Sequence, residues 1–229
     1  MHRNVSLIFF LLGVVILSGC AQTPVVTQKS EMGNLLLAEP APVNPRSEMA
    51  IARYNQILMS SALSNEDKAE LHFQRGMLYD SVGLGGLAQF DYNQAISLKP
   101  DLAEAYNSLG IHFVQQNDFI QAYDAFDSTL DINPDYYYAF LNRGIALYYG
   151  GRSELAVADL EKFAQEDNSD PFRALWAYFA HYAVSPEQGV QFLASIRPEL
   201  DNAHWATALA DMFLGTKNEN DVLNSLLDG

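Results

Sequence analysis

The sequence predicts an all-α protein whose central helices form a solenoid of repeats. Apolar residues recur at helical spacing from Ser47 onward, and no segment shows the strict alternation of a half-buried strand. Small residues also return at a fixed interval of 34 residues in the middle of the chain. Such a period is typical of a helical hairpin that stacks on copies of itself and buries a shared core.

The repeat places small residues at two fixed positions, followed by a large one and a proline. A 34-residue period with this arrangement is the tetratricopeptide repeat (TPR) pattern. Glycine and alanine let the backbones of the two helices approach, and the large side chain fills the space beside them. The residues in register are Gly76, Gly110 and Gly144; Ala88, Ala122 and Ala156; Tyr92, Phe126 and Leu160; and Pro100 and Pro134.

We assign TPR units to residues 69–102, 103–136 and 137–170. The third unit is the least regular. Its proline, Pro171, comes three residues late, and Phe163 stands where a small residue is usual.

Helices are also expected on both sides of the repeats. Residues 47–68 are expected to contain a helix that either caps the solenoid or makes a dimer contact. Ser47 is its expected N-cap. A capping box, Ser64-x-x-Asp67, is expected to open the next helix. Residues 171–229 are expected to form capping helices, one starting at Ser185-Pro186, one spanning 203–214 and a short one opened by Thr216-x-x-Glu219.

The N-terminus has the features of a secretory signal peptide. Positive charge at Arg3 precedes an apolar stretch from Val5 to Leu17, which is shorter than the roughly 20 residues of a membrane span. The stretch ends in Leu17-Ser18-Gly19-Cys20, which resembles the bacterial lipobox. The resemblance implies cleavage after residue 19, acylation of Cys20 and a lipid anchor. Residues 20–46, which contain four prolines, are interpreted as the lipidated cysteine and its tether.

Composition narrows the classes of partner. Removal of residues 1–19 takes away Arg3 and leaves 12 basic residues against 28 acidic ones, a net charge near −16. This charge disfavours nucleic acid and anionic lipid surfaces, so membrane contact is expected through the lipid alone. Cys20 is the one cysteine, so the domain has no disulfide. Ala21 follows it, which by the enterobacterial sorting rule, carried over by resemblance, favours the outer membrane.

No catalytic constellation is recognised in the sequence. The five histidines form no His-x-x-x-His or HExxH pair, and neither G-x-S-x-G nor a P-loop occurs. Gly83 to Gly86 are interpreted as a turn within the first repeat. We therefore expect no enzyme, no metal and no cofactor, with a dispersed active site as the remaining alternative.

The predicted interaction site is the inner groove of the solenoid, lined by five positions of each first helix. The residues assigned to partner binding are Phe73, Met77, Asp80, Asn107, Ile111, Tyr138, Tyr148 and Tyr149. The complete set adds Glu70, Ser81, Glu104, Val114, Gln115, Leu141 and Ile145. It contains no Lys or Arg, so the basic clamp that binds a carboxylate in TPR co-chaperones is missing. An apolar, aromatic surface with acidic edges suits a helix or extended segment of a partner. The alternative is that neighbouring helices bury these side chains.

Several motifs together resemble the NlpI family of outer-membrane TPR lipoproteins. They are "RGMLYDSVGL" from Arg75, "LNRGIALYYGGR" from Leu141 and "DPFRALW" from Asp170, combined with the lipobox and the 34-residue register. The resemblance covers about residues 47 to 214. Members of that family continue past the position of Gly229 with another TPR-like helix pair, so functions that need this pair are not carried over.

The resemblance implies a homodimeric, non-catalytic adaptor that faces the periplasm. Such an adaptor presents murein hydrolases, notably of the MepS type, to a periplasmic protease of the Prc type, and thereby regulates cell-wall growth and division. N-terminal helices form the dimer in that family. A second hypothesis is an assembly subunit or pilotin of an outer-membrane or secretion complex, which would co-purify with one large complex instead of soluble enzymes.

Overall fold

The structure is a computed structural model that describes residues 44–60 and 62–227. The predicted signal peptide, Cys20 and nearly all of the tether lie outside the described residues. Within the described part every regular element is helical, as predicted. The elements are α2 (Pro45–Leu58), α3 (Asn65–Ser81), α4 (Gly85–Leu98), α5 (Ala103–Gln115), α6 (Phe119–Ile132), α7 (Tyr137–Tyr149), α8 (Ser153–Ala164), α9 (Pro171–Val184), α10 (Pro186–Ile196), η2 (Arg197–Glu199), α11 (Thr207–Phe213) and α12 (Glu219–Leu227).

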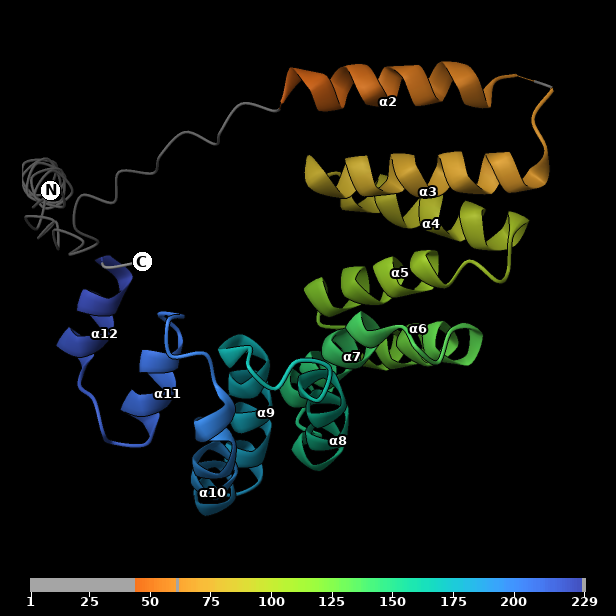
Figure 1. Cartoon of the computed structure of the whole chain (residues 1–229). Coiled ribbons are helices and arrows are strands. Elements are labelled where there is room, and N and C mark those ends of the chain that lie inside the picture. Colours follow the sequence, from red (N-terminus) through yellow and green to blue (C-terminus); the bar gives the residue numbers. More distant parts are fainter. Residues whose placement is uncertain (1–43, 61, 228–229) are drawn as a thin grey trace, which may run out of the picture. The chain divides into compact units, whose positions relative to one another are not determined.

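Successive helices pack as antiparallel hairpins. The pairs α3–α4, α5–α6 and α7–α8 make the most extensive contacts of the three repeats, while α4 packs on α5 and α6 on α7 (Figure 1). Each hairpin therefore rests on its neighbours in sequence, as expected for a solenoid. None of the helices in the described part is long and apolar enough to cross a membrane.

The repeated glycines mark the closest approach of the two helices in each hairpin. A Cβ atom on Gly110 would lie 2.6 Å from Cε1 of Phe126, and one on Gly144 would lie 2.6 Å from Cγ of Leu160. At Gly76 the nearest atom is Cε1 of Tyr92, at 2.7 Å. No real Cβ fits at these distances, so the register predicted from the sequence has the physical basis that we assigned to it.

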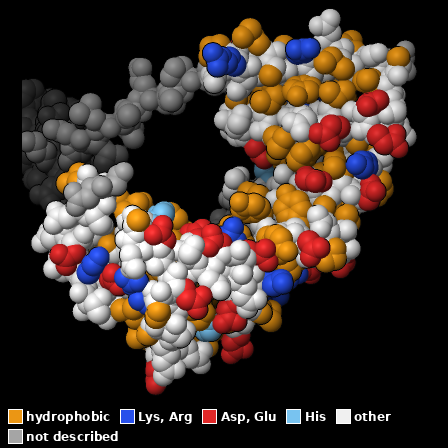
Figure 2. Space-filling view, viewed as in Figure 1, with side chains coloured by type: hydrophobic (Ala, Val, Ile, Leu, Met, Phe, Trp, Pro, Cys, Tyr) orange, Lys and Arg blue, Asp and Glu red, His pale blue; other side chains and the backbone are white. Residues whose placement is uncertain are grey.

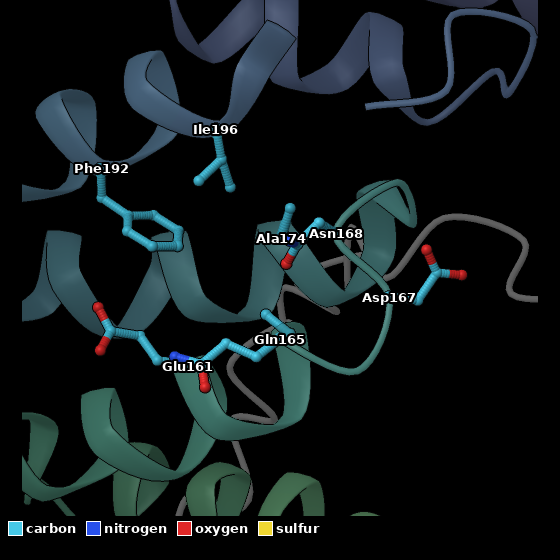
Figure 3. A pocket seen from close by; sticks show the side chains of 8 residues that line it. Glu161, Gln165, Asp167, Asn168, Ala174, Phe192 and Ile196 are labelled. Carbon is cyan, nitrogen blue, oxygen red and sulfur yellow. The ribbon is translucent and has the colours of Figure 1, made fainter. Parts of the chain in front are cut away.

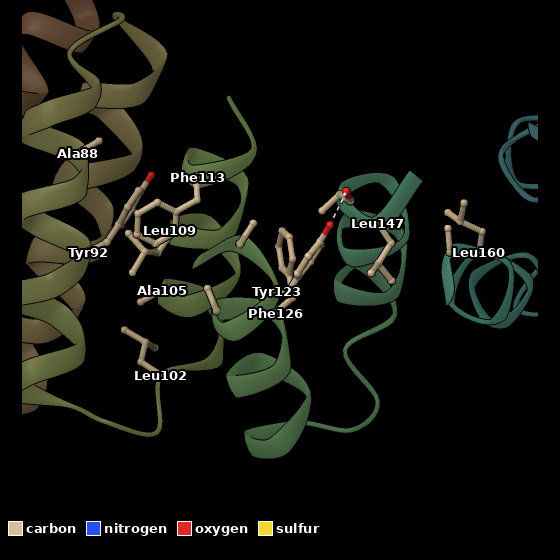
Figure 4. Packing of buried hydrophobic residues seen from close by; sticks show 14 of the residues in the cluster. Ala88, Tyr92, Leu102, Ala105, Leu109, Phe113, Tyr123, Phe126, Leu147 and Leu160 are labelled. Carbon is tan, nitrogen blue, oxygen red and sulfur yellow. Dashed lines mark hydrogen bonds between the residues drawn. The ribbon is translucent and has the colours of Figure 1, made fainter. Parts of the chain in front are cut away.

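The large side chain that each repeated glycine contacts lies at the centre of the core. Tyr92, Phe126 and Leu160 are almost completely buried, and further apolar side chains from both helices of each repeat pack around them (Figure 4). Burial raises the pKa of Tyr92, and its hydroxyl donates a hydrogen bond of 2.7 Å to Asp80. The core is continuous from the first repeat to α9.

Two of the three hairpins also contain an internal ion pair. Arg75 donates to both carboxylate oxygens of Asp91 at 2.6 Å, and Arg143 does the same to Asp159 at 2.7 and 2.8 Å. The hydrogen bonds and charge of these carboxylates raise the pKa values of both arginines. The second hairpin has Leu109 in register with the arginines and an alanine in register with the aspartates.

The helix starts agree with the sequence in some places and differ in others. The capping box is confirmed, since Ser64 Oγ accepts from Asp67 N at 3.0 Å, and Ser185 caps α10 as expected. The prediction of Ser47 as N-cap is wrong: the Asn44 side chain accepts from Arg46 N, and the helix begins two residues earlier than Ser47. The turn predicted at 83–86 is confirmed at Gly83, whose φ is +78°, but it is shorter than predicted, because Gly85 and Gly86 already belong to α4.

The C-terminal helices begin with a fourth hairpin. Helix α9 packs on α8 as extensively as on α10, so α9–α10 extends the stack. In this hairpin the two helices approach closely at a different position from that in the repeats. A Cβ on Gly189 of α10 would lie 2.8 Å from Cα of Tyr182 on α9. The helix expected at 203–214 begins only at Thr207. The last helix begins at Glu219, where Asn218 provides the capping side chain instead of Thr216.

Candidate functional site

Four of the eight predicted groove residues are exposed, and they lie on three successive first helices. Met77 on α3 is 37% exposed and Ile111 on α5 is 36% exposed. On α7, Tyr138 and Tyr149 are 61% and 62% exposed. We call these four residues the first-helix surface. Each of the four therefore presents at least a third of its surface to solvent.

Two of the predicted residues contribute to the interior instead. Phe73 is buried, and its ring lies 6.1 Å from that of Tyr92. Asn107 is also buried, and its Oδ1 accepts a hydrogen bond of 3.0 Å from Asn142 on α7. Phe73 faces the second helix of its own hairpin and Asn107 faces the following hairpin, so neither is available to a partner in this structure.

Asp80 and Tyr148 are half-buried and connect the surface to the core. One oxygen of Asp80 accepts from Tyr92, and the other lies 3.6 Å from Nδ1 of His112, a buried atom for which the described residues provide no hydrogen-bond partner. Asp80 is thus fixed at the junction of the first and second hairpins. Tyr148 packs against the core and meets the ring of Tyr149 edge-on at 5.2 Å.

At the aromatic end of the first-helix surface, Tyr138 packs against Phe163 of α8. The ring of Tyr138 lies 5.9 Å from that of Phe163, and the guanidinium of Arg173 lies over the ring of Phe163, 4.1 Å from its centroid. Phe163 is the large residue that the sequence places where a small one is usual. Its burial explains the irregular third repeat, because the ring fills the junction with α9 and holds Tyr138 in place.

The electrostatic character of this part of the molecule is acidic. The fifteen predicted groove positions include the exposed Glu70 and Glu104 and no lysine or arginine. Two arginines of the first helices, Arg75 and Arg143, are occupied by internal aspartates. In Figure 2 hydrophobic side chains gather over α2 to α5, with acidic side chains beside them. The surface is therefore suited to an apolar or positively charged segment and not to an anion.

The histidines of the described residues make structural contacts and form no cluster typical of metal binding. His72 pairs with Asp91 and His181 with Glu161, both at 2.8 Å, which accounts for two of the histidines as structural contacts. His204 lies edge-on to Phe172 at 5.1 Å. Within residues 44–60 and 62–227 no group of three or more His, Cys, Asp or Glu is placed to hold a metal ion.

A second set of exposed apolar residues was not predicted from the sequence. Leu87 and Phe90 on α4 are 48% and 56% exposed, and Leu155 on α8 is 57% exposed. They lie on second helices, for which the groove positions make no prediction. A search for large apolar residues outside the repeat's buried positions could have found them.

Comparison with solved structures identifies the fold as a TPR solenoid. A MamA crystal structure has 20% sequence identity and a TM-score of 0.61 over 68% of this chain and 83% of that one. The TPR protein YrrB, described as having an unusual peptide-binding site, has 18% identity and a TM-score of 0.55 over 76% of this chain and 91% of its own. The TPR domain of Arabidopsis OM64 has 20% identity and a TM-score of 0.50, covering 52% of this chain and 98% of that domain. No protein-family profile matches the sequence.

Proposed function

We propose that this protein is a non-catalytic adaptor that binds other proteins on its first-helix surface. The observation that carries the proposal is the exposure of Met77, Ile111, Tyr138 and Tyr149 on successive first helices of a TPR stack. Tyrosine and methionine are enriched at interfaces, and tyrosine provides a large contact area at low entropic cost. A peptide-binding site in YrrB, on the same kind of fold, supports this use of the scaffold.

The partners that we propose are periplasmic. The lipobox-like end at Cys20 and the motifs shared with NlpI-type lipoproteins favour an outer-membrane anchor and a role in presenting murein hydrolases of the MepS type to a protease of the Prc type. The mechanism is proximity: a tether raises the effective concentration of enzyme and substrate at the membrane without new chemistry.

The membrane anchor has a separate test. Cells that express the chain are labelled with an alkyne-bearing palmitate analogue, and the protein is recovered from separated inner and outer membranes. The proposal expects label on the wild-type protein in the outer-membrane fraction and none on Cys20→Ser. Labelled protein that stays in the inner membrane would contradict the sorting rule, and an unlabelled wild type would contradict the anchor.

Homodimer formation through α2 is part of the same proposal. No residue of α2 is buried, and Met49 on it is 65% exposed, so the helix has surface left after packing on α3. Light scattering in detergent measures the mass of the wild type and of Met49→Asp. We expect a dimer that dissociates in the variant. A monomeric wild type would contradict the dimer. A dimer that is unaffected by Met49→Asp would show that the dimer contact lies elsewhere.

The binding surface is tested by site-directed photo-cross-linking in cells. A photoreactive phenylalanine replaces Tyr149, and the control has it at Phe90, which is 56% exposed on the second helix α4. We expect a murein endopeptidase or a C-terminal-processing protease to be captured from position 149 and not from position 90. Equal capture from both positions would contradict the assignment of partner binding to the first-helix surface.

The same experiment distinguishes the second candidate function. Capture of several subunits of one membrane complex in fixed ratio would favour an assembly subunit or pilotin over an adaptor for soluble enzymes. Activity of the purified protein on cell-wall material, lost on a single substitution, would contradict the non-catalytic assignment.

A further inference from the structure

A small cavity lies between the third and fourth hairpins. Its volume is about 200 Å³, and it is bounded by the end of α8, the turn that follows it, α9 and α10 (Figure 3). Ligand pockets for whole small molecules measure roughly 300–1,000 Å³, so this one is of a size for a single side chain. Its lining includes Glu161, Gln165, Asp167, Asn168, Phe192 and Ile196.

The lining combines apolar walls with two carboxylates. Phe192 and Ile196 project from α10 into the cavity, while Glu161 and Asp167 lie toward its opposite ends (Figure 3). Hydrogen bonds from the hydroxyl and backbone N–H of Ser169 lower the pKa of Asp167 and keep it ionised. Among the described residues that line the cavity there is no lysine or arginine. A ligand with an apolar stem and a positively charged head would match this arrangement.

The repeat register shows how the protein uses a carboxylate at this place. Glu161 is 34 residues after Asp127, and Asp127 accepts a hydrogen bond of 2.5 Å from Nη1 of Arg143 in the following first helix. The residue in register with Arg143 in the fourth hairpin is Ala177. The carboxylate position is kept, but among the described residues no arginine pairs with it.

Glu161 still has an oxygen available. Its Oε1 accepts from Nε2 of His181 at 2.8 Å, while Oε2 makes no hydrogen bond with the described residues. His181 also stacks on Phe192, with ring centroids 4.5 Å apart, which fixes both rings beside the carboxylate. The protein already stacks a guanidinium on a ring at Arg173–Phe163, so an arginine beside Phe192 would repeat a contact that this junction uses.

We propose that this cavity receives one arginine side chain of a partner polypeptide. Its guanidinium would pair with Glu161, and its methylene groups would pack on Phe192 and Ile196. Arginine fits better than lysine because its planar head can pair with a carboxylate and lie on a ring at the same time. The site is separate from the first-helix surface and does not depend on the proposed adaptor function.

The ligand class is tested by saturation-transfer NMR with the full-length protein in detergent. The probe is N-acetyl-arginine N-methylamide. The control is the citrulline analogue, which has nearly the same shape without the charge. We expect saturation transfer to the arginine methylene protons, and a dissociation constant for citrulline about tenfold weaker or more. Equal binding of the two probes, or no transfer to arginine, would overturn the proposal.

Two variants test whether the arginine probe binds in this cavity. Glu161→Gln keeps the shape and the acceptor for His181 but removes the charge, and Gln165→Trp narrows the cavity from an exposed position. Both are expected to weaken arginine binding about tenfold or more, with unchanged circular dichroism and midpoint of thermal unfolding. The matched control is Glu154→Gln, an exposed carboxylate on the same helix, which should bind like the wild type. Unchanged binding by both folded variants, or equal loss in the control, would overturn the site.

Discussion

The second and third hairpins have the same close contact and different residues around it. In both, a glycine of the first helix lies against a large side chain of the second, Phe126 or Leu160. Beside this contact the second hairpin is apolar, with Leu109, whereas the third has the ion pair of Arg143 and Asp159.

The outward positions differ as well. The second hairpin exposes Ile111 and buries Asn107, while the third exposes Tyr138 and Tyr149. Both hairpins keep the glycine contact together with a fully buried alanine in register, Ala122 or Ala156, so we infer that these close-packed positions determine the hairpin. The flanking interior accepts either an ion pair or apolar packing, and the outward positions are free to acquire an aromatic binding surface.

The strongest test of this comparison removes one partner of the ion pair. Arg143→Ala leaves Asp159, whose side chain is 9% exposed, without its counter-charge. We expect a loss of about 3 kcal/mol in the free energy of unfolding, since an unpaired buried charge is poorly solvated. Urea titration measures it. Arg143→Leu with Asp159→Ala imitates the second hairpin and should cost less than about 1 kcal/mol. A double variant as unstable as the single one would show that the two interiors are not interchangeable.

A smaller effect is expected at the shared contact. Gly110→Ala places a Cβ 2.6 Å from the ring of Phe126, so the helices must separate, at a cost of about 2 kcal/mol. Gly86→Ala is the control, because its Cβ would meet no atom within 4 Å and α4 gains helix propensity there. The midpoint of thermal unfolding should fall for the first variant and stay or rise for the second. If Gly110→Ala were as stable as the wild type, the claim that the glycine contact determines the hairpin would be wrong.

The smallest effect concerns a third Arg–Asp pair, outside the repeats. Arg197 donates to both oxygens of Asp211, and these hydrogen bonds lower the pKa of that carboxyl. A lowered folded-state pKa adds stability above the ordinary carboxyl pKa, near 4, and the contribution disappears as the pH falls through the lowered value. Asp211→Asn should therefore be less stable than the wild type at pH 7, with a smaller difference at pH 3. Urea unfolding at both values measures this, and a difference that grows in acid would have the wrong sign.

The repeat architecture could be predicted from the sequence because its signal is periodic. Gly76, Gly110 and Gly144 are separated by the helix-pair length, and short-range chemistry such as the Ser64 capping box is readable directly. The fourth hairpin was not recognised as one, since its close contact at Gly189 falls outside the repeat's positions.

The candidate surface was predictable only in part. Helical position indicates which side of a first helix a residue occupies, but the burial of Phe73 and Asn107 depends on how closely other helices pack, α4 for Phe73 and α7 for Asn107. The cavity beside Glu161 depends on the placement of α10, for which the sequence offers no period. The arginine–aspartate spacing of 16 residues, seen twice, was the signal available for the internal ion pairs.

The central claim is that the exposed aromatic end of the first-helix surface binds a periplasmic partner. The most direct measurement is the affinity of a purified murein endopeptidase for the full-length protein in detergent, by isothermal titration calorimetry. We predict that Tyr149→Ala weakens binding by at least about 30-fold, as expected for an aromatic hot spot, while Phe90→Ala binds like the wild type. Equal affinities of the wild type and both variants, or no binding by the wild type, would contradict the account.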